Sequence, residues 1–474
     1  MPRISPRAAV KAASKATAEI SQSTPAPITP ISTMINQRAI PTEASEELAA
    51  FRSKAPKPKP EQPPPSIRQH HQKQHRKGAP PQSPPPPKET VPIDFTDFTP
   101  RDKFEISTSL PRSYFLGHHN AALTRMRQSL SNVGLILEVR DFRVPISSWN
   151  PLLEQSLSST SAGVPRSRII VYTKRDLAPP AQMTPHGRPV PGTQPPGNVI
   201  RTLRNFHRPP RVNNVKDMIF LGMGPHGESL QGLLNGIRDV AREMDSLTGL
   251  RVMVVGMPNA GKSTLLNRLR SHSLHLGKAA KTGAQPGVTR KLGTPVRILP
   301  GEDSGDPDTM GLGEGVFIVD TPGVFVPYVS EPEAMLKLAL VGCVKDGIIP
   351  AVTVADYLLY RLNLVRETTY LTRFGMGRPT NDVHQFLRAA ARRTGKLRKG
   401  GDESLEHAAD WVIQEWRKGN LGRLLLDEVN PKKLEEAMEL AREPSLSMNQ
   451  ARKREKVARK ERNEAKRAGS GDSA

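Results

Sequence analysis

The chain has 474 residues, with 69 Lys and Arg against 46 Asp and Glu, and a formal net charge of +23. This length predicts two or three domains, and the one cysteine, Cys343, excludes an internal disulfide and suits a reducing compartment. No apolar stretch approaches the length of a membrane span. The composition therefore argues against a disulfide-stapled scaffold and an integral membrane protein, and the charge favours a polyanionic partner.

The first 100 residues divide into two segments that are not predicted to pack. In residues 1–32, four basic residues are spaced by four: Arg3, Arg7, Lys11 and Lys15. This spacing places them on one helix face, as in a mitochondrial transit peptide, and a basic disordered tail is the alternative. Residues 33–100 are dense in Pro, Gln and Lys with almost no aliphatic periodicity, so we expect disorder there.

A guanine-reading motif is predicted at Thr173-Lys174-Arg175-Asp176, directly after the apolar run Arg168–Tyr172. The run predicts a strand, and the carboxyl ends of strands are where α/β sheets bind ligands. A carboxylate at Asp176 can accept both N1–H and N2–H of guanine, which adenine does not offer. Thr173 departs from the usual Asn of Asn-Lys-X-Asp and makes fewer hydrogen bonds, so an ordinary strand-end turn is the alternative.

The next segment predicts a loop that packs on the base. Asp217–Gly224 reads as a strand followed by a Gly-rich turn at Gly222, and Ser229–Met244 is a predicted helix. The usual Ser-Ala of such a loop is missing. Two Pro/Gly-rich insertions, Ala178–Pro196 and Pro300–Gly315, are predicted to be surface loops.

A phosphate-binding loop is predicted at Gly256-Met-Pro-Asn-Ala-Gly261-Lys262-Ser263. The β-branched run Arg251–Val255 feeds into it, and a helix continues after Ser263. The glycines permit a turn that aims backbone N–H groups at the β-phosphate, beside the positive end of the helix. Lys262 is expected to reach the β- and γ-phosphates, and Ser263 to ligate Mg²⁺.

The metal motif follows at Asp320-Thr-Pro-Gly323, after the apolar strand Gly315–Asp320. Asp320 is placed to hold the metal through a water, and Gly323 offers an N–H near the γ-phosphate; a mere turn is the alternative. Thr289, in the Gly-flanked stretch Gly283–Arg290, is expected to be the switch threonine that completes the Mg²⁺ shell when the γ-phosphate is present. A flexible loop without a role for Thr289 is the alternative.

The order of these motifs is unusual. In an ordinary small GTPase the guanine motif comes after the phosphate loop and the metal motif, whereas here Thr173–Asp176 precedes both. The order predicts an α/β fold: a circularly permuted, Ras-like P-loop GTPase domain over residues 101–330, with a mostly parallel sheet and helices on both faces.

Residues 331–442 are predicted to form a small all-α domain. Its apolar stripe and core consist of Ala355, Leu358, Leu359, Leu362, Trp411, Ile413 and Trp416. A basic run predicts RNA binding: Arg388, Arg392, Arg393, Lys396, Arg398 and Lys399. The tail, residues 443–474, carries nine Lys and Arg against three Glu between Arg452 and Arg467. Solvated charged surfaces are the alternative for both basic segments.

The chain resembles the mitochondrial ribosome-assembly GTPases of the circularly permuted class, which are related to the bacterial ribosome biogenesis GTPase A. The resemblance covers residues 105–430. It includes four segments, several of them specific to the family: Leu135–Ser148, Lys337–Ile349, Arg392–Gly401 and Arg417–Arg423.

The resemblance implies roles for two further residues, His118 in catalysis and Asn259 in potassium binding. Val324 stands where many GTPases place the glutamine that orients the attacking water, and a valine cannot hydrogen-bond to water. In the family a histidine within Phe-Pro-Gly-His is implicated instead, and His118 of Tyr114–His119 matches it, with Leu116 in place of the proline. Asn259 resembles the asparagine of potassium-activated GTPases. A surface or packing histidine and a capping asparagine are the alternatives.

Together these features predict a monomeric GTPase that binds GTP and GDP with Mg²⁺, held by Ser263 and Thr289, and uses potassium as activator. The expected nucleotide-binding residues are Thr173, Lys174, Asp176, Asn259, Ala260, Gly261, Lys262, Ser263, Thr264, Thr289, Asp320 and Gly323. The expected partner is the mitochondrial large ribosomal subunit and its rRNA, in the matrix or peripherally on the matrix side of the inner membrane. The alternatives are a nucleotide-stabilised RNA-binding scaffold with little turnover and a membrane-associated signalling GTPase; the lack of a lipidation motif counts against the last.

Overall fold

The computed structural model describes residues 98–107, 110–111, 117–158, 166–179, 194–208, 214–222, 228–280, 282–283, 293–325, 329, 331–397, 402–442, 449–450, 453–454, 456–457 and 460. The chain divides into Met1–Pro84 and Pro85–Ala474, and every described residue lies in the second unit. The predictions for residues 1–32, most of residues 33–100, Thr289, Arg398, Lys399 and most of the tail lie outside the described residues. So does the side chain of His118.

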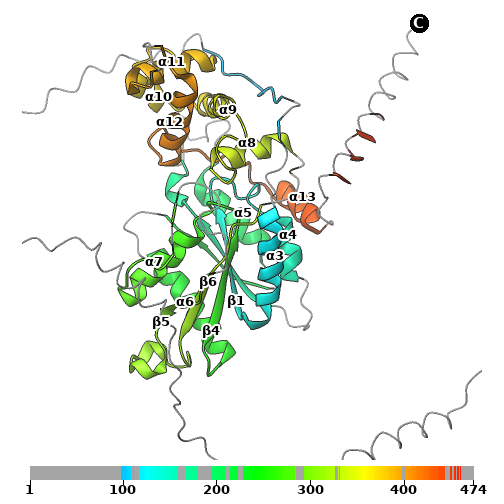
Figure 1. Cartoon of the computed structure of the whole chain (residues 1–474), viewed down its shortest axis with the longest axis vertical. Helices are drawn as coiled ribbons and strands as arrows, with labels where there is room; N and C mark the ends of the chain where they lie inside the picture. Colours follow the sequence, from blue (N-terminus) through cyan, green and yellow to red (C-terminus); the bar gives the residue numbers. More distant parts are fainter. Residues whose placement is uncertain are drawn as a thin grey trace, which may run out of the picture. The chain divides into compact units, whose positions relative to one another are not determined.

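A six-stranded sheet organises the first half of the described chain (Figure 1). Its strands are β1 Leu135–Asp141, β2 Ser167–Thr173, β3 Val215–Phe220, β4 Leu250–Gly256, β5 Val296–Leu299 and β6 Val316–Asp320. They lie in the order β3-β2-β1-β4-β6-β5, and all neighbours are parallel except β5 and β6, which are antiparallel. Every residue of β1 is buried, as expected of a parallel strand covered on both faces.

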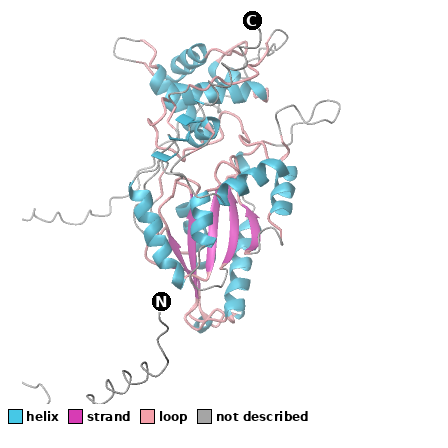
Figure 2. Ribbon diagram, turned by 90° about the vertical axis from the view of Figure 1, so that its right-hand side faces the viewer, coloured by secondary structure: helices cyan, strands magenta, loops and turns pink. Residues whose placement is uncertain are grey.

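Helices cover both faces of this sheet, as Figure 2 shows. Apolar side chains of α6 Glu228–Met244 and α7 Lys262–Leu274 pack on one face against Leu137 and Val254. On the other face, α3 Gly117–Ser129 and α4 Pro151–Ser158 pack against Ile136 and Val255. The helix α5 Pro196–Phe206 covers the β2 and β3 end of that same face.

The strand order explains the unusual motif order. β4, which leads into the phosphate loop, lies between β1 and β6, so strands from earlier and later in the chain flank it. A chain that began at β4 would run β4, β5, β6, β1, β2, β3, and the motif after β2 would then follow the other two. The predicted circularly permuted α/β GTPase fold is therefore confirmed.

The C-terminal half is helical, and most of its helices share one core (Figure 1). The helices are α8 Pro332–Leu340, α9 Ala351–Leu364, α10 Thr369–Phe374, α11 Val383–Thr394, α12 Leu405–Arg417 and α13 Pro431–Arg442. Leu358, Leu359 and Leu362 are fully buried in that core, as their spacing predicts. By contrast, α13 packs on α4 and α5. Among the described helices, none has the length and apolarity needed to cross a bilayer.

Candidate nucleotide-binding site

The residues singled out by the sequence meet at one edge of the sheet. Register pairs Asp141 with Thr173, Val139 with Gly256, and Val254 with Asp320, so the carboxyl ends of β1, β2, β4 and β6 are level. In open α/β sheets ligands bind in the crevice outside these ends.

The phosphate loop has the backbone that its glycines allow. Gly256 has φ of 147° and Gly261 has φ of 103°. A Cβ at Gly256 would overlap the carbonyl oxygen of Val139 on the neighbouring strand, so no other residue fits there. The loop ends at Lys262, the first residue of α7, and the N–H groups of this helix terminus face the crevice, where they suit an anion.

Lys262 is almost completely buried behind the loop. Its Nζ donates to the carbonyl oxygens of Met257 at 2.7 Å and Gly256 at 3.3 Å. Burial lowers the pKa of Lys262 to about 8, although the charge of Asp320 opposes the shift. A buried ammonium held only by neutral carbonyls and one nearby carboxylate gains strongly from a phosphate.

The metal motif faces the first turn of α7. The Ser263 hydroxyl donates to Oδ2 of Asp320 at 2.6 Å, so a hydroxyl and a carboxylate oxygen already lie together. Oxygen ligands of this kind suit Mg²⁺, which takes the rest of its shell from phosphates and water. In the described part of the chain, no three His, Cys, Asp or Glu residues gather into a metal cluster of their own. Gly323 approaches the phosphate loop so closely that a Cβ there would lie 2.5 Å from the Cα of Pro258.

The guanine motif is tied to the phosphate loop by two side chains. Thr173 Oγ1 donates to the carbonyl of Ala260 at 2.6 Å. Lys174 Nζ donates to the carbonyl of Asn259 at 2.8 Å and to Asp141 at 2.8 Å. A threonine in place of the usual asparagine therefore still fastens the end of β2 to the loop.

Asp176 lies beside the loop that follows β3. A Cβ at Gly222 would lie 3.2 Å from Oδ1 of Asp176, and the N–H of Arg175 donates to Leu221 at 3.0 Å. The glycine thus lets the β3 loop approach the carboxylate. Residues 223–227, where the rest of the predicted base-packing turn falls, lie outside the described residues.

A buried carboxylate behind the site was not identified from the sequence. Asp141 accepts from Arg143 through its backbone N–H at 3.0 Å, Nε at 3.0 Å and Nη2 at 2.8 Å, as well as from Lys174. Burial alone would raise the pKa of Asp141, but the charges of Arg143 and Lys174 hold it below its usual value. An acid that ends a buried strand needs a buried cation, and Arg143 two residues after Asp141 was the signal that could have revealed the pair.

A cavity of about 330 Å³ opens at this edge of the sheet. Its walls include Lys262, Ser263, Thr264 and Gly323 from the predicted nucleotide site, together with Thr321. Asn259 also lines it, with φ of 55°, and its Nδ2 donates to the carbonyl of Gly342 at 2.8 Å.

Val324 is buried among Met126, Ile136 and Leu153, and the side chain is part of the packing below α3 and α4. It therefore cannot position a water in the cavity.

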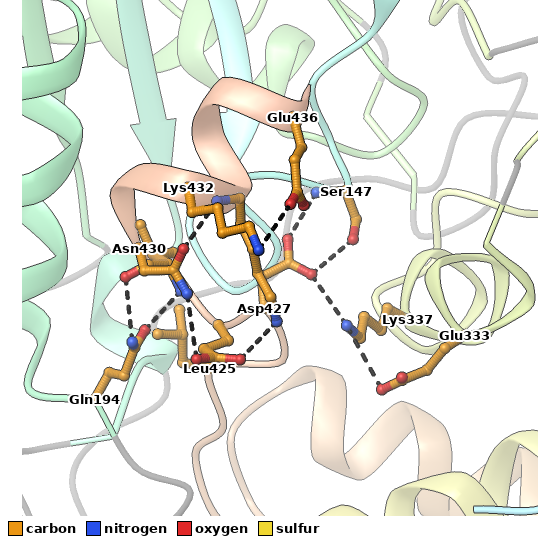
Figure 3. Close-up of polar contacts among 12 residues, drawn as sticks. Ser147, Gln194, Glu333, Lys337, Leu425, Asp427, Asn430, Lys432 and Glu436 are labelled. Atoms are coloured by element: carbon orange, nitrogen blue, oxygen red, sulfur yellow. Dashed lines mark hydrogen bonds and ion pairs between the residues drawn. The ribbon is translucent and has the colours of Figure 1, made fainter. Parts of the chain in front are cut away.

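A larger cavity, about 560 Å³, lies between the β1–α4 loop, α8 and α13. Asp427 lines it and accepts from the N–H and the hydroxyl of Ser147 at 2.7 and 2.6 Å, as Figure 3 shows. Lys337 of α8 lies 3.5 Å from the same carboxylate. These contacts join the β1–α4 loop to α8. Of the phosphate loop only Met257 lines this larger cavity, whereas Pro258, Asn259, Gly261, Lys262 and Ser263 line the smaller one, to which we therefore assign the nucleotide.

Comparisons with known proteins agree with this geometry. The sequence model of a family described as 50S ribosome-binding GTPase matches residues 251–370. Mitochondrial GTPase 1 of Schizosaccharomyces japonicus is 37% identical over 339 residues, which cover 69% of this chain and 94% of the relative. Mitochondrial ribosome-associated GTPase 1 of Xenopus tropicalis is 32% identical over 340 residues, covering 69% of this chain and 98% of the relative. The match to the crystal structure of GNP-bound YlqF from T. maritima is 22% identical in sequence, covers 65% of this chain and 98% of that chain, and has a TM-score of 0.37.

Proposed function

This chain belongs to the mitochondrial GTPase 1 family and is a GTPase, and we propose that it binds the rRNA of the mitochondrial large ribosomal subunit and promotes maturation of that subunit. The observation that carries the proposal is the exposed basic face of α11. The printed names of the relatives, mitochondrial and ribosome-associated, support the same partner.

The basic face follows from how α11 packs. Phe386, Leu387, Ala390 and Ala391 are buried in the helical core, and Arg388, Arg392 and Arg393 are exposed on the opposite side. Arg392 pairs with Glu403 at 2.7 Å, but its side chain is 72% exposed, so the pair contributes little and the guanidinium remains able to contact phosphate. Three arginines on one face suit an RNA backbone, because binding releases the counterions of the phosphates.

In the proposed nucleotide site each motif has one role. Asp176 reads guanine, Lys262 and the loop N–H groups hold the phosphates, and Ser263 and Thr289 ligate Mg²⁺ with Asp320 behind them. The metal would neutralise charge on the phosphates. We further propose that His118 orients the attacking water.

We also propose that a potassium ion is held beside the phosphates by Asn259. The localisation we propose is the mitochondrial matrix, reached through residues 1–32, with peripheral contact to the inner membrane as an option.

The test compares subunit binding by two triple variants. Changing Arg388, Arg392 and Arg393 to Ser should weaken cosedimentation with purified mitochondrial large subunits and flatten the slope of log affinity against log salt by about 2. The control changes three exposed basic residues elsewhere to Ser: Arg201, Lys216 and Lys432.

Two outcomes would contradict the proposal. If both triple variants bind the subunits equally well, α11 is not the RNA surface. GTP turnover by the parent that does not change when large subunits are added would instead favour the scaffold alternative. Turnover of both variants without subunits should match the parent, which shows that the nucleotide site is intact.

A further inference from the structure

We propose that Lys418, at the C-terminal end of α12, is a phosphate-binding residue of the GTPase site and reaches the γ-phosphate of bound GTP. The helical half would then contribute directly to recognition of the triphosphate. The inference rests on the GTPase activity and does not depend on the ribosomal partner.

The first argument is the composition of the cavity wall. The cavity of about 330 Å³ is lined on one side by Pro258, Asn259 and Gly323, where the phosphate loop and the metal motif meet. On the other side it is lined by Gln414, Arg417 and Lys418 of α12 and the residue that follows it. The α12 side chains therefore line the same cavity as Gly323, the residue expected beside the γ-phosphate.

The end of α12 is held at the site by contacts on both sides. The Arg143 guanidinium lies 4.9 Å from the centre of the Trp416 ring. One turn further on, Gly419 is so close to the guanine motif that a Cβ there would lie 2.8 Å from Cδ2 of Leu177. These contacts hold the backbone around Lys418 against the end of β1 and the residue that follows the guanine motif.

Of the three α12 side chains, two are already committed. Arg417 donates to Asp346 at 2.9 Å and to the carbonyls of Leu340 at 2.9 Å and Ala339 at 2.8 Å. Gln414 donates to the same Asp346 at 3.1 Å. Both side chains therefore hold α12 against the end of α8 and are not available to a ligand without breaking that contact.

Lys418 can leave its partner at small cost. Its Nζ donates to Oε1 of Glu415 at 2.8 Å, and its side chain is 64% exposed. Oε2 of Glu415 separately accepts from Arg373 at 2.6 Å and Asn420 at 2.9 Å. Glu415, whose side chain is 9% exposed, thus stays paired with Arg373 and Asn420 when Lys418 moves. The four-carbon stem of a lysine allows the ammonium to swing into the cavity.

Charge also favours this assignment. Among the described cations that line the cavity, Arg143 and Lys174 share the single negative charge of Asp141, Arg417 pairs with Asp346, and Lys418 pairs with Glu415. Glu415 keeps two further donors, Arg373 and Asn420, so Lys418 can meet the phosphates together with Lys262. Lys262 comes from behind the phosphate loop, so Lys418 supplies the second charge from the opposite wall.

The test measures dissociation constants of full-length protein, without ribosomes, for a fluorescent non-hydrolysable GTP analogue and for fluorescent GDP. Lys418→Ala should weaken the GTP analogue roughly tenfold, the size expected for one charge-assisted hydrogen bond. Affinity for GDP should stay within about twofold, because the contact is to the γ-phosphate. Lys418→Arg should retain most of the affinity for the analogue.

The matched control is Lys432→Ala, which removes an exposed lysine paired with a glutamate, Glu436, four residues on in α13, away from the cavity. Lys418→Met keeps the apolar stem and guards against a packing defect in the alanine variant. Equal affinity of Lys418→Ala, Lys418→Met and Lys432→Ala for the GTP analogue would overturn the proposal. Equal weakening for GTP analogue and GDP would overturn the γ-phosphate assignment. Ribosome binding is not measured, so failure of the proposed partner leaves the result unaffected.

Discussion

Replacing Asp141 by Asn should destabilise the protein far more than the loss of one surface charge. The side chain is fully buried and accepts three hydrogen bonds from Arg143 and one from Lys174. The amide has one acceptor oxygen, and its NH₂ would face the donors of a cation. Both cations would then be left without a full counter-charge, and Lys174 would lose one of its two links behind the phosphate loop.

The size of the effect follows from burial. Arg143 is only 1% exposed, and removing one partner of a buried ion pair costs about 3–5 kcal/mol. Because the folded pKa of Asp141 lies below its unfolded value, the contribution is full above that value and is lost as pH falls toward the folded pKa. The difference between parent and variant should therefore be constant from about pH 5 to about pH 8.

Urea unfolding followed by tryptophan fluorescence measures this difference, because the Trp416 ring lies against Arg143. Asp356→Asn is the control, since Asp356 also pairs with an arginine, Arg101 at 2.6 Å, but with side chains 24% and 28% exposed. It should cost about 1 kcal/mol or less. The reasoning is refuted if the two variants lose equal stability.

Four further outcomes concern the nucleotide site. The pKa of Lys262 is lowered to about 8 in the free protein, and a bound phosphate would raise it. GTP affinity should therefore be full below about pH 8 and fall above it, where binding should be accompanied by proton uptake at Lys262. Calorimetry in buffers of different ionisation enthalpy measures this uptake. Asp176→Asn should lose GTP and gain XTP, because the amide pairs with the C2 oxygen of xanthine, and continued preference for GTP would remove Asp176 as the guanine reader. His118→Ala should cut GTP turnover roughly 10²-fold with little change in GTP affinity. Replacing potassium by sodium should lower GTP turnover of the parent, and equal turnover in the two salts would remove the potassium role of Asn259.

Much of the sheet could be predicted because its strands carry local signals. The apolar runs Arg168–Tyr172, Arg251–Val255 and Gly315–Asp320 fall in β2, β4 and β6, and the predicted helix Ser229–Met244 is α6. The strand β5, Val296–Leu299, was not predicted. It is four residues long, lies at the sheet edge and pairs antiparallel with β6, so its sequence shows no long buried run.

The second wall of the cavity could not be predicted, because it is made by contacts between residues distant in sequence. The Asn259 amide meets Gly342, and the Arg143 guanidinium meets Trp416. Neither pair leaves a periodic pattern, since each depends on how the helical core docks on the loops. The sequence identified Arg417–Arg423 only as a segment resembling the family. The structure shows what two of its residues do: Arg417 bonds the end of α8, and Gly419 allows close approach to Leu177.

The permuted order has a mechanical consequence at this wall. Because β6 is the last of the described strands, the segment after Gly323 continues directly to α8, whereas an unpermuted chain would place β1, β2 and β3 between them. The end of α8 is in turn bonded to Arg417, next to the residue proposed to meet the γ-phosphate. A change at Asp320–Gly323 on loss of the γ-phosphate can thus act on α8 through the chain and on α12 through Lys418. A ligand shifts a conformational equilibrium only through contacts that differ between states, and a lysine that binds GTP but not GDP provides such a difference within the helical half.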